Sequence, residues 1–325
     1  MNQAAQNSKL KEGMRNLRSR DADARNSAVE VLSRLGKVAV KPLIAAMETG
    51  ATPIRNSAIE ALGRIGSHSA VKPLIKLLDV ETLQKNVIEA LGNIGDLDAV
   101  EPLTPLLKDT KWWARAAAAK ALGKLGSQES LMPLIMALND FSWGVKRAAA
   151  DALGEIGRTE AVVPLIEALR DGYFSVREGA ASALGRIHDI RARDPLTVAL
   201  RDANAMVRGN AAWALGKIGD PTSIEPLKRA LNDINWWVRG AAAYALGEIG
   251  DINSVEILIE TLKDRDKNVR NNAVKALELI TGKEFLVNSF FTTNFVLFTP
   301  IKVLTGFRFG EDFNSWSRWW KSTRT

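Results

Sequence analysis

Residue types that perform chemistry are few in this 325-residue chain, which narrows its possible functions. Cysteine is absent, so disulfides, thiolate metal ligands and a cysteine nucleophile are excluded. The only histidines are His68 in GSHSAVKP and His188 in GRIHDIRA, and both stand in predicted turns. We interpret His188 as a loop residue at a position that glycine holds in other copies of the same phrase, not as a catalytic base.

Carboxylates and glycines give no reactive arrangement either. A metal site would have to be built from carboxylates, and no clustered run of Asp or Glu suggests one. The carboxylates on predicted helices, such as Glu60, Glu89, Asp151 and Glu178, form no recognisable catalytic pair. The glycines belong to a repeated phrase, L-G-x-[IL]-G, and no Gly-Lys-Ser/Thr follows them. The sequence therefore predicts a protein that is not an enzyme and that uses no metal or cofactor.

Tryptophans form the most distinctive chemical pattern. The stretch DTKWWARAAAAKALGKLG at residues 109–126 recurs as DINWWVRGAAAYALGEIG at residues 233–250. Tryptophan offers a large, rigid contact area at low entropic cost, which is typical of residues that anchor a bound protein segment. The elements around these rings decide whether they are available to a partner or fill a core.

A repeat with a period of 31 residues underlies both stretches. An arginine stands eleven residues before most copies of the final glycine, with Gln84 and Lys146 as exceptions, and a proline stands seven residues after most copies of that glycine. His188 replaces the glycine once, and a ninth copy departs from the pattern at Thr281. The glycines that end the phrase are Gly36, Gly66, Gly95, Gly126, Gly157, Gly219 and Gly250.

Each repeat is predicted to contain two helices. In the fourth copy, Ala114, Ala118 and Leu122 fall on one helical face. Gly126 suits the C-terminus of that helix, and Pro133 suits the first turn of the next one. Neither helix buries its apolar stripe alone, so neighbouring repeats must stack. We therefore predict an all-α fold, an α-solenoid of about nine two-helix repeats over residues 1–282.

Six aspartates recur with the same period of 31 residues as the repeated phrase. Each stands six residues before the basic residue, where it caps the second helix or pairs with that residue in the same or a neighbouring repeat. We interpret this series as structural. Its members are Asp109, Asp140, Asp171, Asp202, Asp233 and Asp264.

The repeated phrase resembles a known family. The pattern D-x-x-x-x-V-R-x-x-A-A-x-A-L-G-x-I-G, followed by A-V-x-P-L-I, is similar to HEAT-like repeats of the phycobilisome (bilin) lyase type over roughly residues 8–282. The resemblance implies the solenoid fold, but such repeats serve lyases, chaperone-like factors, scaffolds and engineered binders alike. Iron-dependent hydroxylases of this family use His-Glu pairs as metal ligands, and this chain has no His-Glu dipeptide. That activity is therefore not expected.

The resemblance also implies which residues of the second helices line the concave face. The matching positions in the first three repeats hold residues such as Asp23, Pro53 and Glu81, so the fold does not require aromatic rings there. We predict that the concave face of repeats four to eight is a binding groove for a protein or peptide. The competing interpretation is that the rings fill gaps between adjacent helices. The predicted binding residues are Trp112, Trp113, Trp143, Phe174, Met206, Trp213, Trp236, Trp237, Tyr244, Lys120, Arg147, Arg186 and Lys217.

The distribution of charge bears on the choice of partner. The formal net charge is +7, but residues 1–20 contribute +4 and residues 302–325 contribute +3, so residues 21–301 are formally neutral. No nucleic acid partner is expected, because the repeats carry no net positive charge. The resemblance leaves a bilin lyase subunit or a tetrapyrrole-handling chaperone as the alternative function. The N-terminal stretch lacks the apolar core of a signal peptide, so a cytoplasmic location is expected.

Residues 283–325 are predicted to form a separate hydrophobic and aromatic extension. The stretches ITGKEF and GEDFNSWSRWW resemble a closing segment of the family that residues 286–309 interrupt. Residues 285–301 carry no charge. We interpret the extension as a cap on the last repeat. The alternatives are contact with a membrane surface, which would make the protein a membrane-associated peripheral adaptor, or self-association, in either case through residues 285–321.

Overall fold

The structure is a computed structural model that describes residues 3–282, 286–287, 298–299 and 320–321. Eighteen α-helices lie between residues 3 and 281, two for each predicted repeat, so the prediction of an all-α solenoid with nine two-helix repeats is confirmed. The chain divides into two compact units, residues 1–161 and residues 162–325, and each is described by itself.

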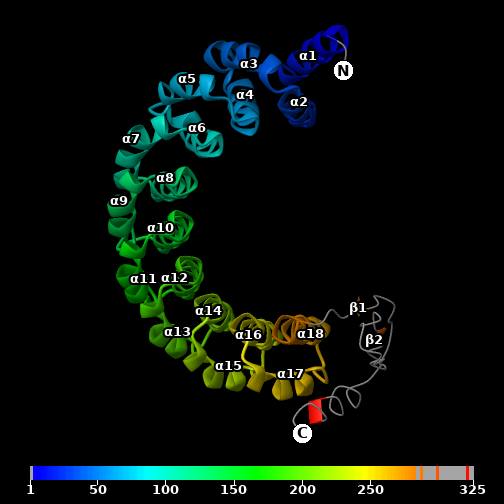
Figure 1. The fold of residues 1–325 in the computed structure, drawn as a ribbon. Helices are drawn as coiled ribbons and strands as arrows, with labels where there is room; N and C mark the ends of the chain where they lie inside the picture. Colours follow the sequence, from blue (N-terminus) through cyan, green and yellow to red (C-terminus); the bar gives the residue numbers. More distant parts are fainter. Residues whose placement is uncertain (1–2, 283–285, 288–297, 300–319, 322–325) are drawn as a thin grey trace. The chain divides into compact units, whose positions relative to one another are not determined.

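In the first unit, each repeat supplies one helix to an outer row and one to an inner row, which follows the concave side of the unit (Figure 1). The inner helices each have 14 residues and pack on one another in sequence. The outer row consists of α1 (Gln3–Leu17), α3 (Lys37–Thr49), α5 (Val71–Ile75), α7 (Val100–Leu103) and α9 (Leu131–Ala137). The inner row consists of α2 (Ala22–Leu35), α4 (Thr52–Ile65), α6 (Glu81–Ile94), α8 (Trp112–Leu125) and α10 (Trp143–Ile156).

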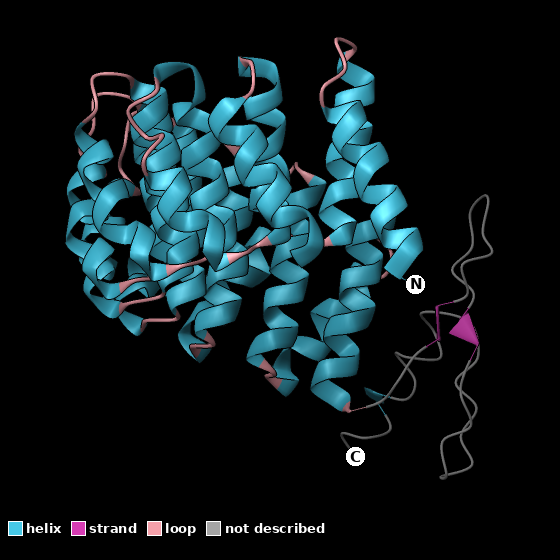
Figure 2. Cartoon of the chain, turned by 90° about the horizontal axis from the view of Figure 1, so that it is seen from above, coloured by secondary structure: helices cyan, strands magenta, loops and turns pink. Residues whose placement is uncertain are grey.

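The second unit repeats the same two-row arrangement. Within a repeat the helices run side by side and the connecting turns lie at their ends (Figure 2). The outer row consists of α11 (Val162–Ala168), α13 (Arg193–Ala199), α15 (Ile224–Ala230) and α17 (Val255–Thr261). The inner row consists of α12 (Phe174–Ile187), α14 (Ala205–Ile218), α16 (Trp236–Ile249) and α18 (Lys267–Thr281).

Short 3₁₀ turns precede most outer helices and explain where the prolines lie. In each of six repeats the proline is the third residue of the outer helix, as at Pro133 in α9, where a missing N–H costs little. Pro42 differs because α3 starts directly after Gly36, which leaves this proline in the interior of the helix. The turns before outer helices are η1 (His68–Ala70), η2 (Leu97–Ala99), η4 (Gln128–Ser130), η5 (Thr159–Ala161), η6 (Ile190–Ala192), η7 (Pro221–Ser223) and η8 (Ile252–Ser254), whereas η3 (Thr104–Lys108) follows α7.

The two glycines of the repeated phrase have different roles. The second ends the inner helix in a left-handed conformation, as Gly250 does after α16 with φ 77°. His188 adopts the same conformation, with φ 59°, and its N–H bonds to the Leu184 carbonyl. The first glycine allows close packing, because a Cβ on Gly216 would lie 2.6 Å from Cα of Ala245 in the next inner helix. His188 is therefore a helix-ending residue, as its place in the repeat predicts.

Beyond α18 the structure describes three short pieces of the predicted extension. Strand β1 (Leu286–Val287) pairs antiparallel with β2 (Phe298–Thr299), with Leu286 opposite Thr299. Trp320 and Lys321 are helical. The other residues of the segment 285–321, on which the cap, membrane and self-association hypotheses depend, lie outside the described residues. Among the described helices, none is both long enough and apolar enough to cross a lipid bilayer.

Candidate functional site

The predicted aromatic residues lie mainly at the N-terminal ends of the inner helices. In the first unit Trp112 and Trp113 begin α8 and Trp143 begins α10. In the second unit Phe174 begins α12, Trp236 and Trp237 begin α16, and Met206 is the second residue of α14. These aromatic and Met side chains therefore lie at one end of the inner row in each unit, whereas Trp213 and Tyr244 lie in the second halves of α14 and α16.

Exposure divides the predicted residues into two groups. Trp143 is 50% exposed and Trp236 is 45% exposed, which is high for rings of this size. Trp112, Phe174, Met206 and Trp237 are also exposed. Trp113, Trp213 and Tyr244 are half-buried, although the resemblance places all of them on the exposed face.

Packing against glycines explains why some of these rings are not free. A Cβ on Gly185 of α12 would overlap Cζ3 of Trp213, and a Cβ on Gly209 of α14 would overlap Nε1 and Cδ1 of Trp237. Each ring therefore fills a space that glycine leaves on the preceding inner helix. Trp236 packs edge-on against Trp237, with ring centres 6.2 Å apart and an angle of 78° between the planes. The gap-filling interpretation thus applies to Trp213 and Trp237.

An ion-pair ladder positions the turns from which the aromatic residues emerge. Arg208 donates from Nε and Nη2 to the Asp233 carboxylate of the next repeat, at 2.7 and 2.8 Å, and from Nη1 to the Asp202 carbonyl of its own repeat, at 2.9 Å. The Asp233 carboxylate also accepts the N–H of Asn235, the residue before Trp236. The same pairing joins Arg115 to Asp140 in the first unit, and Arg177 to Asp202 and Arg239 to Asp264 in the second.

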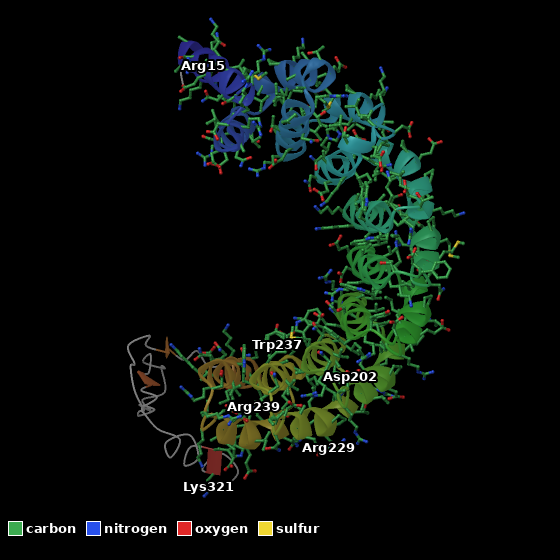
Figure 3. All side chains as sticks on the ribbon, turned by 180° about the vertical axis from the view of Figure 1, so that it is seen from behind. Arg15, Asp202, Arg229, Trp237, Arg239 and Lys321 are labelled. Carbon is green, nitrogen blue, oxygen red and sulfur yellow. The ribbon has the colours of Figure 1, made fainter. Side chains whose placement is uncertain are left out.

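The ladder settles how the aspartate series is used. Four of the six carboxylates, those of Asp140, Asp202, Asp233 and Asp264, pair with the arginine of the preceding repeat. Each of these four also accepts an amide N–H within its own turn, so it does not cap the inner helix directly. Figure 3 shows Asp202 and Arg239 between the two rows, with Trp237 on the inner side and Arg229 on the outer row. Each arginine therefore fixes one turn against the next, and with it the start of an inner helix.

Burial and hydrogen bonding act in opposite directions on the ladder carboxylates. Burial raises the pKa of Asp233, but hydrogen bonds from Arg208 and from the Asn235 N–H lower that pKa further, so the net pKa lies below its usual value. The pKa values of Asp140, Asp202 and Asp264 are lowered by the same balance. The hydrogen bond with Asp233 raises the pKa of Arg208. The ladder is therefore fully ionised at neutral pH.

Basic residues predicted for the site are partly neutralised by carboxylates. Lys217 donates to Tyr244 Oη and to Glu248 Oε2, each at 3.0 Å. The hydrogen bond to Tyr244, and then that to Glu248, raises the pKa of Lys217. Arg147 bonds to Asp151 on the same helix at 2.8 Å. A surface that pairs its cations in this way is poorly suited to tracking phosphates.

The remaining predicted basic residues are more accessible. Lys120 and Arg186 are exposed. Lys120 lines a small cavity of about 250 Å³ between α6 and α8, together with Glu89 and Lys124. Lys124 donates to Asn93 Oδ1 at 2.6 Å across that cavity. This part of the first unit is a polar hollow and carries none of the predicted aromatic rings.

Three exposed apolar residues in the turns extend the site beyond the predicted set. Phe141 is 102% exposed and Ile234 is 84% exposed, each two residues before the tryptophan that begins an inner helix. Tyr173, directly before Phe174, is exposed too. Sequence reasoning missed them because it considered only positions on the helices. The available signal was an apolar residue in a turn that otherwise favours polar ones.

The histidines take no part in a reactive cluster. His68 is exposed in η1 and its Nδ1 lies 2.6 Å from Asp96 Oδ2. The Asp98 backbone N–H and then His68 lower the pKa of Asp96 by hydrogen bonding. Within the described residues, no group of three or more His, Cys, Asp or Glu side chains is arranged to hold a metal ion.

Comparison with known proteins identifies the repeat and the fold. A family model described as HEAT repeats matches residues 8–85, 81–142, 131–202 and 194–278. The Escherichia coli protein YibA has a similar solved structure, with a TM-score of 0.56, 22% identity, and coverage of 80% of this chain and 98% of that one. This likeness supports the fold alone.

Other solved structures are similar at lower scores. An engineered protein gives a TM-score of 0.48 at 23% identity, covering 84% of this chain and 88% of its own. The CpcE–CpcF complex of phycocyanin lyase from Nostoc sp. PCC7120 gives 0.46 at 22% identity, covering 75% and 94%. No curated protein matches the chain in sequence.

Proposed function

Because the chain belongs to the HEAT repeat family, we propose that it is a non-enzymatic scaffold that binds a protein segment through exposed rings at the starts of its inner helices. Two surfaces carry the proposal. The first-unit cluster consists of Trp112 and Trp143. The second-unit cluster consists of Phe174, Met206, Trp236 and Trp237.

The exposure of Trp236 is the observation on which the proposal rests. Trp237 and Trp213 each pack into the space that a glycine leaves on the preceding inner helix. Trp236, in contrast, is 45% exposed and contacts Trp237 edge-on. Burying a side chain of this size stabilises a complex by about 2 kcal/mol or more when it reaches a fitted pocket. A ring that the fold leaves open at a repeated position is best explained by a partner that covers it.

The paired polar groups along the inner helices favour a polypeptide over a nucleic acid. Lys217 is shared between Tyr244 and Glu248, and Arg147 is paired with Asp151. A polyanion would have to displace these carboxylates before it reached the cations. A protein segment carries both donors and acceptors, so it bonds to such pairs at the edge of an apolar contact.

Paired capture experiments test the proposal. The chain and its Trp143→Ala/Trp236→Ala variant are used as bait in nuclease-treated lysate of the source organism. A Met132→Ala/Val163→Ala variant is the matched control, because both side chains are exposed on the outer row. We expect the wild type and this control variant to retain the same protein, and the tryptophan variant to retain at least about tenfold less, with unchanged helical content and melting temperature.

Two results would contradict the proposal. One is equal capture by the tryptophan variant and the wild type. The other is a captured species that absorbs visible light and contains no polypeptide, which would point to a tetrapyrrole ligand. Collapse of the melting temperature in the tryptophan variant would assign the two rings to the core instead.

A further inference from the structure

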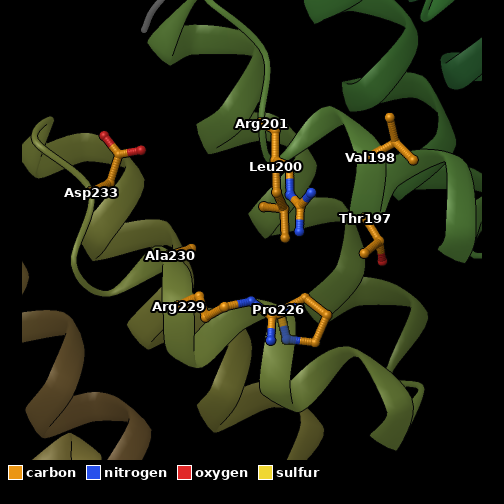
Figure 4. Close-up of a pocket in the computed structure, with 8 residues that line it drawn as sticks. All are labelled: Thr197, Val198, Leu200, Arg201, Pro226, Arg229, Ala230 and Asp233. Atoms are coloured by element: carbon orange, nitrogen blue, oxygen red, sulfur yellow. The ribbon is translucent and has the colours of Figure 1, made fainter.

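The outer row of the second unit contains a cavity that the aromatic clusters do not touch. It has a volume of about 410 Å³ and lies between the outer helices α13 and α15. Its walls include Val198, Leu200 and Pro226, and Thr197 contributes a hydroxyl group. Figure 4 shows Arg201 and Arg229 reaching toward this same space from the two sides.

The two arginines have no counter-ion among the residues that the structure describes. Neither guanidinium makes an ion pair or a hydrogen bond there, and both side chains are exposed. Asp233, which also lines the cavity, is committed to Arg208 at 2.7 and 2.8 Å and to the Asn235 N–H. Lys228 on α15 is paired with Glu225 at 2.9 Å. The cavity is therefore left with two uncompensated positive charges.

The arginine pair is specific to these two repeats. One repeat earlier, the position of Arg201 is held by Arg170, but the residue opposite it is Val198. One repeat later, the corresponding residues are Asn232 and Glu260. The repeat fold therefore does not require two arginines at one cavity, and placing like charges together costs free energy unless an anion lies between them.

Part of the cavity wall is apolar, so a ligand must also cover apolar surface. Val198 is exposed on α13, and Leu200 and Pro226 are half-buried beside it. A ligand that satisfied only the guanidinium groups would leave this apolar surface in water. A ligand with a planar anionic group next to a hydrocarbon side chain would satisfy both parts.

We propose that this cavity binds an acidic peptide segment, in which one or two carboxylates pair with Arg201 and Arg229 and an adjacent apolar residue covers Val198 and Pro226. Arginine presents its N–H groups as a planar fork that matches a carboxylate with two parallel hydrogen bonds. The site is separate from the aromatic clusters, so it binds a second partner or a second part of one partner.

Peptide titrations test the assignment. A fluorescein-labelled peptide with a Leu-Glu-Glu-Leu core is titrated with the full chain and followed by fluorescence anisotropy, in parallel with a Leu-Gln-Gln-Leu analogue. Arg201→Gln and Arg229→Gln are the test variants. Arg170→Gln is the matched control, because Arg170 holds the same position one repeat earlier without an arginine opposite it.

We expect the acidic peptide to bind at least about tenfold more tightly than the neutral analogue, and each test variant to lose about tenfold in affinity while Arg170→Gln binds as the wild type does. Melting temperatures should not change, because neither guanidinium makes an ion pair or a hydrogen bond with the residues that the structure describes. Equal binding of the two peptides, or an equal loss in Arg170→Gln, would overturn the proposal. So would arginine-dependent binding of inorganic phosphate without binding of the acidic peptide, which would make this a free-anion site.

Discussion

The indole of Trp237 lies against Gly209 of the preceding inner helix, in the space that any side chain at residue 209 would occupy. Trp236, its neighbour in sequence, makes no such contact with a glycine and is more exposed. Two identical adjacent residues therefore have different roles. Trp237 fixes two helices against each other and is only partly exposed, whereas Trp236 offers more of its ring to a partner.

Substituting Gly209 with alanine is expected to force Trp237 out of its place. Alanine favours a helix by about 1 kcal/mol over glycine, but overpacking of this kind costs about 1–3 kcal/mol, so we expect a net loss of stability of up to about 2 kcal/mol. Thermal unfolding measures this loss, and a red shift in tryptophan emission reports the displaced ring. Gly172→Ala is the control, since a Cβ there meets nothing within 4 Å. Equal behaviour of the two variants would refute the packing role.

Removing the ring of Trp213 or of Trp236 should have unequal effects on stability. Trp213 is half-buried against Gly185, so we expect Trp213→Ala to lower the free energy of unfolding by about 2–3 kcal/mol. Trp236→Ala removes an exposed ring and should cost less than about 1 kcal/mol. Urea titration of the two variants is the measurement. A larger loss in Trp236→Ala would mean that its ring belongs to the core.

Breaking one ion pair of the ladder should destabilise the second unit markedly. Arg239 and Asp264 have side chains that are 7% and 12% exposed, so Arg239→Gln leaves a largely buried carboxylate without its partner. We expect a loss of about 3 kcal/mol. Arg270 is the matched control, because it bonds to the Asp264 and Arg265 carbonyls and pairs with no carboxylate in the described chain. Arg270→Gln should lower the free energy of unfolding by about 1 kcal/mol. An equal loss in both variants would show that the Arg239–Asp264 ion pair adds nothing beyond the hydrogen bonds to carbonyl groups.

Completing the ladder in the first unit should stabilise the protein. Gln84 occupies an arginine position, and its Nε2 lies 3.4 Å from Asp109 Oδ2, while its Oε1 is buried without a hydrogen-bond partner. Arginine at this position would supply a charged fork and remove the unpaired acceptor. We expect Gln84→Arg to raise the free energy of unfolding by about 1–2 kcal/mol. A lower melting temperature than the wild type would show that the site cannot accommodate the longer side chain.

Acid should weaken the ladder. The folded-state pKa values of Asp202, Asp233 and Asp264 lie below the usual value of about 3.9, so the unfolded chain binds protons first as the pH falls. The ladder therefore contributes its full stability above the unfolded-state pKa and loses it as the pH drops through the folded-state values. Melting temperatures recorded from pH 7 to pH 3 should decline most steeply below about pH 4, and Asp264→Asn should flatten that decline. If the melting temperature of Asp264→Asn fell with pH as steeply as that of the wild type, the Arg239–Asp264 ion pair would be excluded as a cause of the decline.

The sequence by itself determined the repeat, the helices and their ends, because these depend on interactions within a few residues. Gly250 ends α16, and His188 could be assigned the same role from its place in the repeat. Periodic alanines and leucines specified the buried faces in the same local way, as Ala118 and Leu122 of α8 illustrate.

Only the tertiary structure decided which of the repeated side chains are free. The partner of Arg208 is Asp233, 25 residues away, although Asp202 in its own repeat was an equally good candidate from the sequence. Trp236 and Trp237 are chemically identical, and what separates them is the position of Gly209 on another helix. Exposure is set by contacts between residues distant in the chain, and spacing along one helix carries no information about what the next helix places opposite it.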